Sequence, residues 1–90
     1  LIHEYEGRCT VFHLDWYRLT EVQDADERLA AECFNERSVA IIEWADRGRA
    51  ILPREHLWIQ MGHAGATTRD LSMESRSPRY EKVMHAVARL

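Results

Sequence analysis

The sequence lacks several features that would assign it to a membrane or secreted class. Its longest aliphatic run covers residues 39–42, far below the ~20 apolar residues that span a bilayer. It holds two cysteines, Cys9 and Cys33, with no CxxC spacing, whereas small secreted scaffolds are usually dense in disulfides. We therefore expect no membrane-spanning helix, reduced cysteines and a cytoplasmic protein.

The sequence also lacks an excess of positive charge. Twelve Lys and Arg residues stand against fifteen Asp and Glu residues, which gives a net charge of −3. A domain whose main task is to grip phosphate backbones usually shows a clear basic excess. Any contact with RNA should then be local or made through a partner.

Paired ligands of the kind that hold structural zinc are missing too. Such ligands usually come as two pairs, each about two to four residues apart. Cys9 and His13 share a strand face, but no second pair with this spacing occurs among the two cysteines and five histidines. A thiol nucleophile is also disfavoured, because Cys33 falls on the apolar stripe of a predicted helix, where thiols are usually inert.

What is present fits an α/β domain. Residues 1–6 and 9–15 predict a β-hairpin that turns at Gly7. A capping box at residues 20–23 predicts the start of a helix. The apolar stripe of that helix has three- and four-residue spacing and consists of Ala25, Leu29, Ala30, Cys33 and Phe34. Residues 38–44 predict a strand whose continuous apolar centre indicates burial on both faces.

The second half of the sequence predicts shorter elements. They are a helical turn at 45–50 closed by Pro53, a strand at 57–61, a turn at 62–66 and a half-exposed edge strand at 67–75. Ser77 as N-cap and Pro78 at the first helical position predict a final helix. Its apolar face consists of Tyr80, Val83, Met84 and Val87.

Two acidic residues follow the first two apolar strands that a helix connects. A strand, a helix of about a dozen residues and a second strand form a βαβ unit with parallel strands. Asp15 and Glu43 should therefore lie at the carboxyl ends of neighbouring strands, where open α/β sheets bind ligands. Two carboxylates there repel each other unless a cation lies between them or one is protonated. The pair suits a Mg²⁺–nucleotide site; the alternative is a structural pair whose carboxyl groups lie far apart or on opposite edges.

Four motifs together resemble the TsaE family, also called YjeE. They are Glu4-Tyr5, the His-x-Asp-x-Tyr-Arg-Leu of residues 13–19, the Ile-Glu-Trp of residues 42–44 and Leu52-Pro53, and they cover about residues 1–61. The family is a small P-loop ATPase of the bacterial cytosol. It supports formation of N6-threonylcarbamoyladenosine in tRNA and works with the TsaD and TsaB proteins.

The resemblance implies a role for each candidate residue. Asp15 corresponds to the acid that acts near magnesium and the attacking water, and Glu43 corresponds to the magnesium-associated acid. Both are thus candidate catalytic and metal-binding residues. Trp44 corresponds to the aromatic neighbour of the second acid, and Arg69 aligns with a residue at the nucleotide's edge. The implied cofactors are Mg²⁺ and ATP.

The sequence departs from the family pattern because it lacks the phosphate-binding loop. It contains no GxxxxGK[ST] phosphate loop, whose backbone N–H groups and lysine cradle the phosphates. We therefore expect a P-loop NTPase-like mixed sheet, truncated at the N-terminus, with a β-hairpin and flanking helices, as a single domain over residues 1–90. The chain alone should bind ATP very weakly and should not hydrolyse it.

The resemblance also implies partners. They are the TsaD and TsaB homologues and, through their complex, tRNA. No contact with a membrane is expected. An exposed sheet edge offers pairing with a second copy of the chain. The basic residues Arg47, Arg49 and Arg54 form either a solvated face or a docking surface for a protein or tRNA. The alternative function is a non-catalytic interaction module that holds a partner with the same surface.

Overall fold

The computed structural model describes residues 2–75 and 77–90 of the chain. These residues form two compact units, Leu1–Leu52 and Pro53–Leu90, and each is described by itself. The architecture is mixed α/β, as the sequence predicts. A single domain over residues 1–90 stays a prediction.

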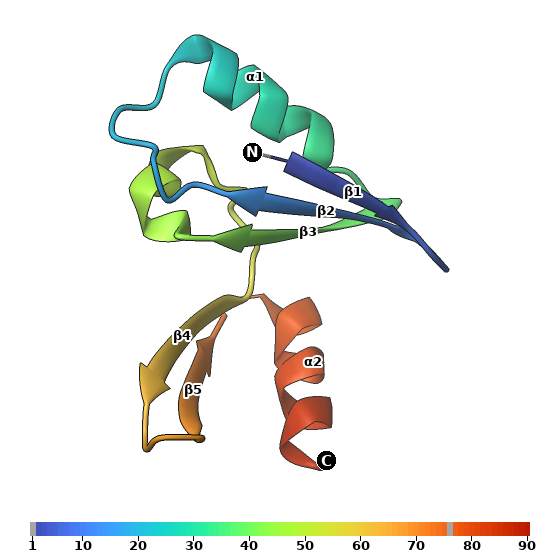
Figure 1. Ribbon diagram of the computed structural model, residues 1–90. Helices are drawn as coiled ribbons and strands as arrows, with labels where there is room; N and C mark the ends of the chain where they lie inside the picture. The colour runs from blue at the N-terminus through green and yellow to red at the C-terminus, as the bar shows by residue number, and fades with distance from the viewer. Residues whose placement is uncertain (1, 76) are drawn as a thin grey trace. The chain divides into compact units, whose positions relative to one another are not determined.

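The first unit is built on a sheet of three strands. They are β1 (Ile2–Glu6), β2 (Thr10–Asp15) and β3 (Ser38–Glu43), in that order across the sheet. Strand β1 pairs antiparallel with β2, and β2 pairs parallel with β3 (Figure 1). The predicted hairpin and the predicted βαβ unit are both confirmed.

Helix α1 (Asp24–Cys33) connects β2 to β3 and begins later than predicted. Its N-cap is Gln23, whose backbone N–H donates to Asp26 Oδ2 at 3.0 Å. The predicted capping box at residues 20–23 is therefore wrong by three positions. Asp26 offers its carboxylate to an N–H group at the helix start, where negative charge is favoured.

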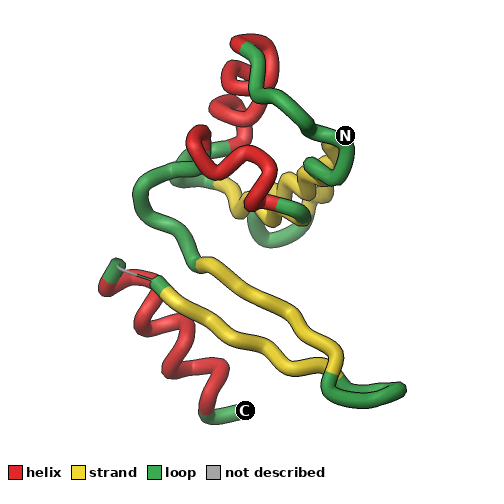
Figure 2. The backbone as a smooth tube through the Cα atoms, turned by 90° about the vertical axis from the view of Figure 1, so that its left-hand side faces the viewer, coloured by secondary structure: helices red, strands yellow, loops and turns green. Residues whose placement is uncertain are grey.

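The core of this unit lies between the sheet and α1, which covers one face of the sheet (Figures 1 and 2). Its buried residues are Leu14, Trp16, Ala30 and Cys33. Half-buried side chains surround them, namely Ile2, Phe12, Leu19, Phe34, Ala40, Ile42, Ile51 and Leu52. Side chains alternate across a strand, so Phe12 and Leu14 of β2 both point toward this core.

Strand β3 is not buried on both faces, which corrects the sequence prediction. Its residues alternate between half-buried and exposed, and the side chains of Val39 and Ile41 are 47% and 53% exposed. A continuous apolar run gives full burial only where layers cover both faces of a sheet. In this unit α1 packs on the face of Ala40 and Ile42, so the other half of the run remains open to solvent.

A short 3-10 helix, η1 (Ala45–Ile51), follows β3 and ends before Pro53. Its Gly48 is buried against the ring of Trp16. The contact ties the segment after β3 to the segment after β2. The two acidic strand ends are therefore followed by loops that pack on each other.

The second unit is a hairpin and a helix. Strands β4 (Trp58–His63) and β5 (Arg69–Glu74) pair antiparallel (Figure 2). Gly62 pairs with Asp70, so the turn spans residues 64–68 rather than the predicted 62–66. Helix α2 (Pro78–Ala88) starts after Ser77 as predicted. Among the described residues, no helix combines the length and apolarity needed to cross a membrane.

Candidate functional site at the carboxyl ends of β2 and β3

The structure brings Asp15 and Glu43 together. They are register partners at the last position of the parallel pair β2–β3. Neighbouring strands lie about 4.8 Å apart and register partners point to the same face, so both side chains leave the sheet on one side. Trp16 N–H also donates to Glu43 O at 3.1 Å, which continues the pairing past the acids. The two acids therefore end neighbouring strands at one edge of the sheet, not at opposite edges.

Each carboxylate is oriented by one hydrogen bond. Asp15 Oδ1 accepts from the backbone N–H of Tyr17 at 2.9 Å, the short local bond by which Asp side chains form turns. Glu43 Oε1 lies 2.9 Å from His13 Nε2, and the His13 tautomer with a proton on Nε2 donates to it. His13 lies two residues before Asp15 and thus on the same face of β2. The two bonds use one oxygen of each acid, Asp15 Oδ1 and Glu43 Oε1.

These acids fit part of a magnesium site. Mg²⁺ usually takes one or two carboxylates and completes its shell with water and substrate phosphates. Asp15 and Glu43 supply two such carboxylates from adjacent strands. Across residues 2–75 and 77–90, no group of three His, Cys, Asp or Glu side chains is arranged to hold a metal ion. The remaining ligands would therefore come from water and phosphate.

Trp44 directly follows Glu43 in an unusual backbone conformation. Its φ of 58° and ψ of 39° are left-handed, and no other non-glycine residue in the described part of the chain has a positive φ. This conformation costs free energy for any bulky L-residue. The Trp44 side chain is also 49% exposed, so about half of it stays in contact with water.

The ring of Trp44 belongs to a cluster that sequence reasoning missed. Tyr17 and Trp44 meet edge to face, with centroids 4.9 Å apart at 61°. The Arg47 guanidinium lies 5.4 Å from the centroid of each ring. We call Tyr17, Trp44 and Arg47 the aromatic–arginine cluster. Its sequence signal is an aromatic residue just after each acidic strand end, together with an arginine three residues beyond Trp44.

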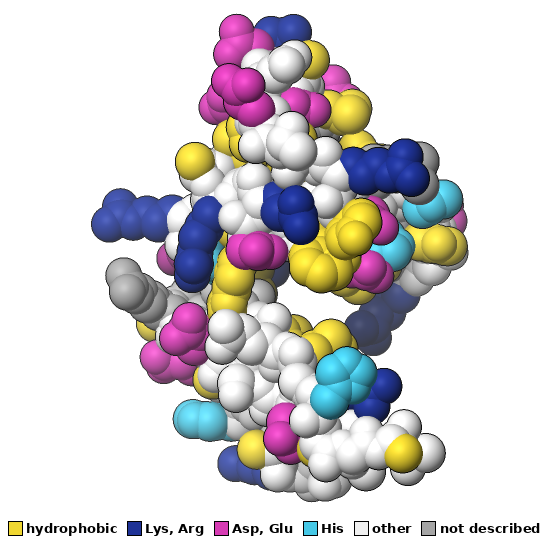
Figure 3. All heavy atoms as spheres, turned by 60° about the vertical axis from the view of Figure 1, so that its left-hand side comes forward, with side chains coloured by type: hydrophobic (Ala, Val, Ile, Leu, Met, Phe, Trp, Pro, Cys, Tyr) yellow, Lys and Arg dark blue, Asp and Glu magenta, His cyan; other side chains and the backbone are white. Residues whose placement is uncertain are grey.

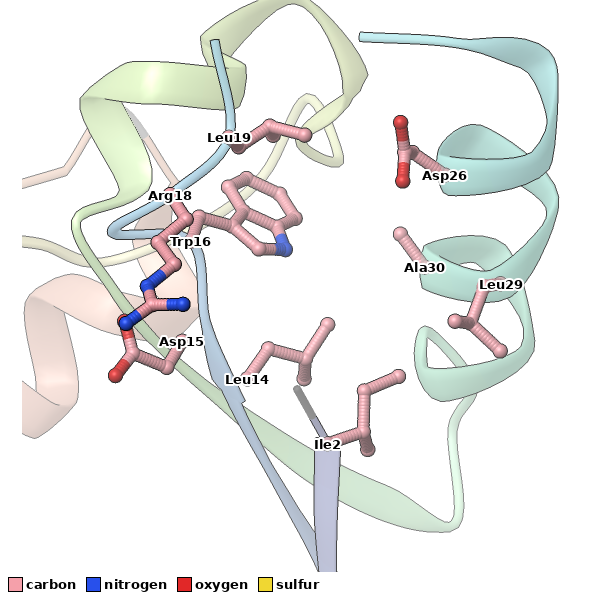
Figure 4. A pocket seen from close by; sticks show the side chains of 9 residues that line it. All are labelled: Ile2, Leu14, Asp15, Trp16, Arg18, Leu19, Asp26, Leu29 and Ala30. Atoms are coloured by element: carbon pink, nitrogen blue, oxygen red, sulfur yellow. The ribbon is translucent and has the colours of Figure 1, made fainter.

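The pocket beside the acids faces the core. Figure 4 shows Leu14 and Trp16 pointing toward α1, while Asp15 points to the other side of β2. The pocket has a volume of about 220 Å³ between β2 and α1. Residues of the aromatic–arginine cluster and Glu43 are not among its lining residues. The cluster and Glu43 therefore belong to the open surface of the unit.

Arg69 lies in β5 of the second unit. Its Nη1 donates to Thr68 O at 2.8 Å and to Gly65 O at 3.3 Å. These bonds hold the turn of its own hairpin. Its contact with a nucleotide stays a prediction.

The thiols do not form part of the site. Cys33 is buried and Cys9 is exposed, and both are free. Burial raises the pKa of the Cys33 thiol, and the negative charges of Glu32 and Glu4 raise it further. A thiol with a raised pKa is a poor nucleophile at neutral pH.

The sequence matches a family model and curated relatives. The model described as "Threonylcarbamoyl adenosine biosynthesis protein TsaE" matches residues 1–71, which reaches past the motifs of residues 1–61. The tRNA threonylcarbamoyladenosine biosynthesis protein TsaE of Treponema pallidum is 36% identical over 68% of this chain and 45% of its own length. The Bacillus subtilis protein of the same name is 32% identical over 99% of this chain and 56% of its own length.

A solved structure is similar as well. The crystal structure of Bacillus subtilis YdiB matches with a TM-score of 0.74 and 30% identity, over 98% of this chain and 55% of that one. The chain spans about half the length of the curated relatives it matches. The family model covers well over half of this chain, and the matched residues 1–71 include both acids at the edge of the sheet. The chain therefore belongs to the TsaE family of threonylcarbamoyl adenosine biosynthesis proteins.

Proposed function

We propose that the chain is the magnesium-side portion of an ATPase required for N6-threonylcarbamoyladenosine formation in tRNA. The observation that carries the proposal is the register pairing of Asp15 with Glu43 at the carboxyl edge of the sheet. Membership of the TsaE family supports the pathway. A pair of acids at this edge suits a division between holding the metal and positioning water.

Each residue has a role in this proposal. Glu43 is the magnesium-associated acid, and His13 holds its carboxylate in place through the 2.9 Å contact. Asp15 acts near the metal and orients the attacking water. When bound, magnesium would neutralise charge on the phosphates of ATP. Trp44 and Arg69 would contact the nucleotide.

The chain alone should bind MgATP weakly and should not turn it over. Two carboxylates face the triphosphate without the backbone N–H groups and lysine of a phosphate loop. We would titrate Mg²⁺ and then MgATP into the 90-residue chain and follow the backbone amides of Asp15 and Glu43 by NMR. Magnesium should shift these two amides, and Asp15→Asn with Glu43→Gln should remove the shift.

Glu36→Gln is the matched control, because Glu36 is an exposed acid outside the pair. Its Mg²⁺ titration should equal that of the unmodified chain. A titration unchanged by Asp15→Asn with Glu43→Gln would overturn the magnesium role. ATP turnover by the chain alone, abolished by Glu43→Gln, would overturn the expected inactivity.

The proposed partners are the TsaD and TsaB homologues in the cytoplasm, with tRNA reached through their complex. A second candidate function is a non-catalytic interaction module of the same complex. The exposed rings of Tyr17 and Trp44, 53% and 49% exposed, favour it because large exposed aromatics often mark binding surfaces. Pulldown of TsaD and TsaB homologues by the Asp15→Asn, Glu43→Gln variant separates the two functions. Retained capture without any magnesium response supports the module.

A further inference from the structure

We propose that the aromatic–arginine cluster is a stacking platform for an unpaired RNA base, so that the chain touches RNA directly. The inference concerns an RNA base as ligand; it shares Trp44 with the proposed nucleotide contact but does not depend on magnesium binding by Asp15 and Glu43. Three observations carry it: the strained backbone of Trp44, the edge-to-face geometry of the cluster, and its position on open surface among arginines.

Trp44 combines a strained backbone with a side chain that stays half exposed. A left-handed conformation costs a bulky residue free energy, and such outliers gather at functional sites. A large aromatic that is half exposed also leaves apolar surface in water. The fold thus holds Trp44 outward at a cost, although Gly or Asn would adopt the same φ with less strain. A flat ligand that binds against Trp44 would stack on the part of the ring that this backbone conformation exposes.

The geometry of the cluster suits the binding of planar rings by stacking. Tyr17 fixes the Trp44 ring edge to face, and Arg47 sits over both rings. Contacts of this kind hold the platform in one orientation. Bases of single-stranded RNA stack on aromatic side chains and on arginine guanidinium planes. The cluster provides both kinds of partner, aromatic rings from Tyr17 and Trp44 and a guanidinium from Arg47.

The charges next to the cluster suit one or two phosphates rather than a long backbone. Arg18 follows Tyr17, Arg49 lies two residues after Arg47, and both are exposed. Figure 3 shows basic and hydrophobic side chains next to one another on the surface of this unit. The acids Asp15, Glu43 and Asp46 lie in the same segments and oppose further phosphate contacts. Affinity should therefore come mostly from base stacking.

An open platform favours RNA over a free nucleotide. Small-molecule sites are concave and bury most of their ligand, whereas the cluster lies outside the 220 Å³ pocket. Single-stranded nucleic acid needs only exposed rings and a nearby positive charge. ATP carries the same chemistry in its adenine, so the experiment compares the two sources.

The test uses the full 90-residue chain and fluorescently labelled 12-nucleotide oligo(A) and oligo(U). Anisotropy should rise with both single strands and should stay flat with a 12-base-pair RNA duplex. Competition by ATP should require concentrations far above those of the oligonucleotides. With three arginines near the cluster, the slope of log K against log salt should not exceed about −2 in magnitude.

Variants identify the surface. Trp44→Gly keeps the left-handed backbone and removes the ring, and it should lower RNA affinity on the order of ten- to hundred-fold. Trp44→Phe should retain most of the binding. Arg47→Lys should weaken it because the guanidinium plane is lost, and Arg47→Ala should weaken it more because the positive charge is lost as well. Matched controls are Trp58→Phe and Arg28→Ala, which alter a tryptophan and an exposed arginine in other elements.

The outcomes are distinct. Loss of binding in Trp44→Gly, with both controls unchanged and circular dichroism retained, supports the platform. Equal affinity for ATP and oligo(A) would assign the surface to a free nucleotide and overturn the RNA inference. Undetectable RNA binding would overturn it too, as would a Trp44→Gly defect limited to capture of TsaD or TsaB homologues. A failed magnesium titration would leave this result untouched, so the two proposals fail separately.

Discussion

At the scale of single residues, the left-handed backbone at Trp44 should make a Gly variant more stable than an Ala variant, which reverses their usual order. Both substitutions remove the ring and its contacts with Tyr17 and Arg47, so the comparison isolates the φ of 58°. Ala pays roughly 1–2 kcal/mol in the left-handed region, whereas Gly does not. We expect Trp44→Gly to be about 1 kcal/mol more stable than Trp44→Ala in urea unfolding. An Ala variant as stable as the Gly variant would show that position 44 is not held in this conformation.

Cys33 gives the chain a loss of stability at alkaline pH. Its pKa is raised in the folded state by burial and by the charges of Glu32 and Glu4. As pH rises past the ordinary thiol pKa, the unfolded chain releases this proton before the folded chain does. Stability from this group is therefore complete below that pKa and falls as pH increases toward the raised value.

Replacing the thiol should remove part of this dependence. We expect Cys33→Ala to flatten the decline in unfolding free energy above about pH 8.5, measured by urea denaturation at several pH values. Cys9→Ala is the control, because Cys9 is exposed, and its profile should match that of the unmodified chain. A decline that persists unchanged in Cys33→Ala would contradict this assignment.

At the scale of elements, Gly48 controls how η1 packs on the segment after β2. A Cβ at this position would lie 2.7 Å from Trp16 Cζ3 and 2.8 Å from Trp16 Cε3. The atoms that the new Cβ would meet belong to the rigid ring of the buried Trp16, so Gly48→Ala should destabilise the chain by about 1–3 kcal/mol, as overpacking usually does. Thermal unfolding followed by circular dichroism measures the effect.

Gly62 offers a matched control for this substitution. A Cβ at Gly62 would meet nothing within 4 Å, and its φ is not positive. Gly62→Ala should therefore be neutral or slightly stabilising through the reduced freedom of the unfolded chain. Equal effects of the two substitutions would argue against the contact between η1 and Trp16.

Local patterns predicted elements well where the signal lies within the element itself. The hairpin, the parallel pairing of β2 and β3 and the Ser77–Pro78 helix start all follow from alternation, crossover length and capping. From these it followed that Asp15 and Glu43 would meet. The start of α1 was missed because residues 20–23 and Gln23–Asp26 offer competing caps, and only the geometry of the preceding turn selects between them.

Features that depend on neighbouring layers could not be predicted in this way. The apolar run of β3 is compatible with one covered face or two, and residue composition does not say how many layers exist. The aromatic–arginine cluster needs the turn after β2 and the loop after β3 to approach, which is tertiary information. Strain at Trp44 is likewise invisible in the sequence, since tryptophan is not a residue that favours positive φ.

At the scale of the whole molecule, the open edge of β3 should direct self-association. Among residues 2–75 and 77–90, strand β3 pairs with β2 on one side and with no strand on the other. Residues 38–43 contain no Pro or Lys that would block edge pairing. A two-fold symmetric contact between edge strands is antiparallel and isologous. Placing Ala40 opposite its own copy sets Val39 against Ile41 and Arg37 against Glu43. In that register exposed apolar side chains lie opposite each other and so do opposite charges. Neighbouring registers do not achieve both.

Charge exchange tests this register. Arg37→Glu alone should weaken the dimer by placing like charges opposite each other, and Glu43→Arg alone should do the same. The double variant should restore association, because the pair is re-formed with its signs reversed. Arg28→Glu controls for net charge, since Arg28 is exposed on α1. Sedimentation equilibrium over a concentration series measures each dissociation constant. A chain that stays monomeric throughout would contradict the edge contact. If the double variant weakens the dimer by the sum of the two single effects, this register is contradicted, because the effects of independent sites add while paired charges compensate.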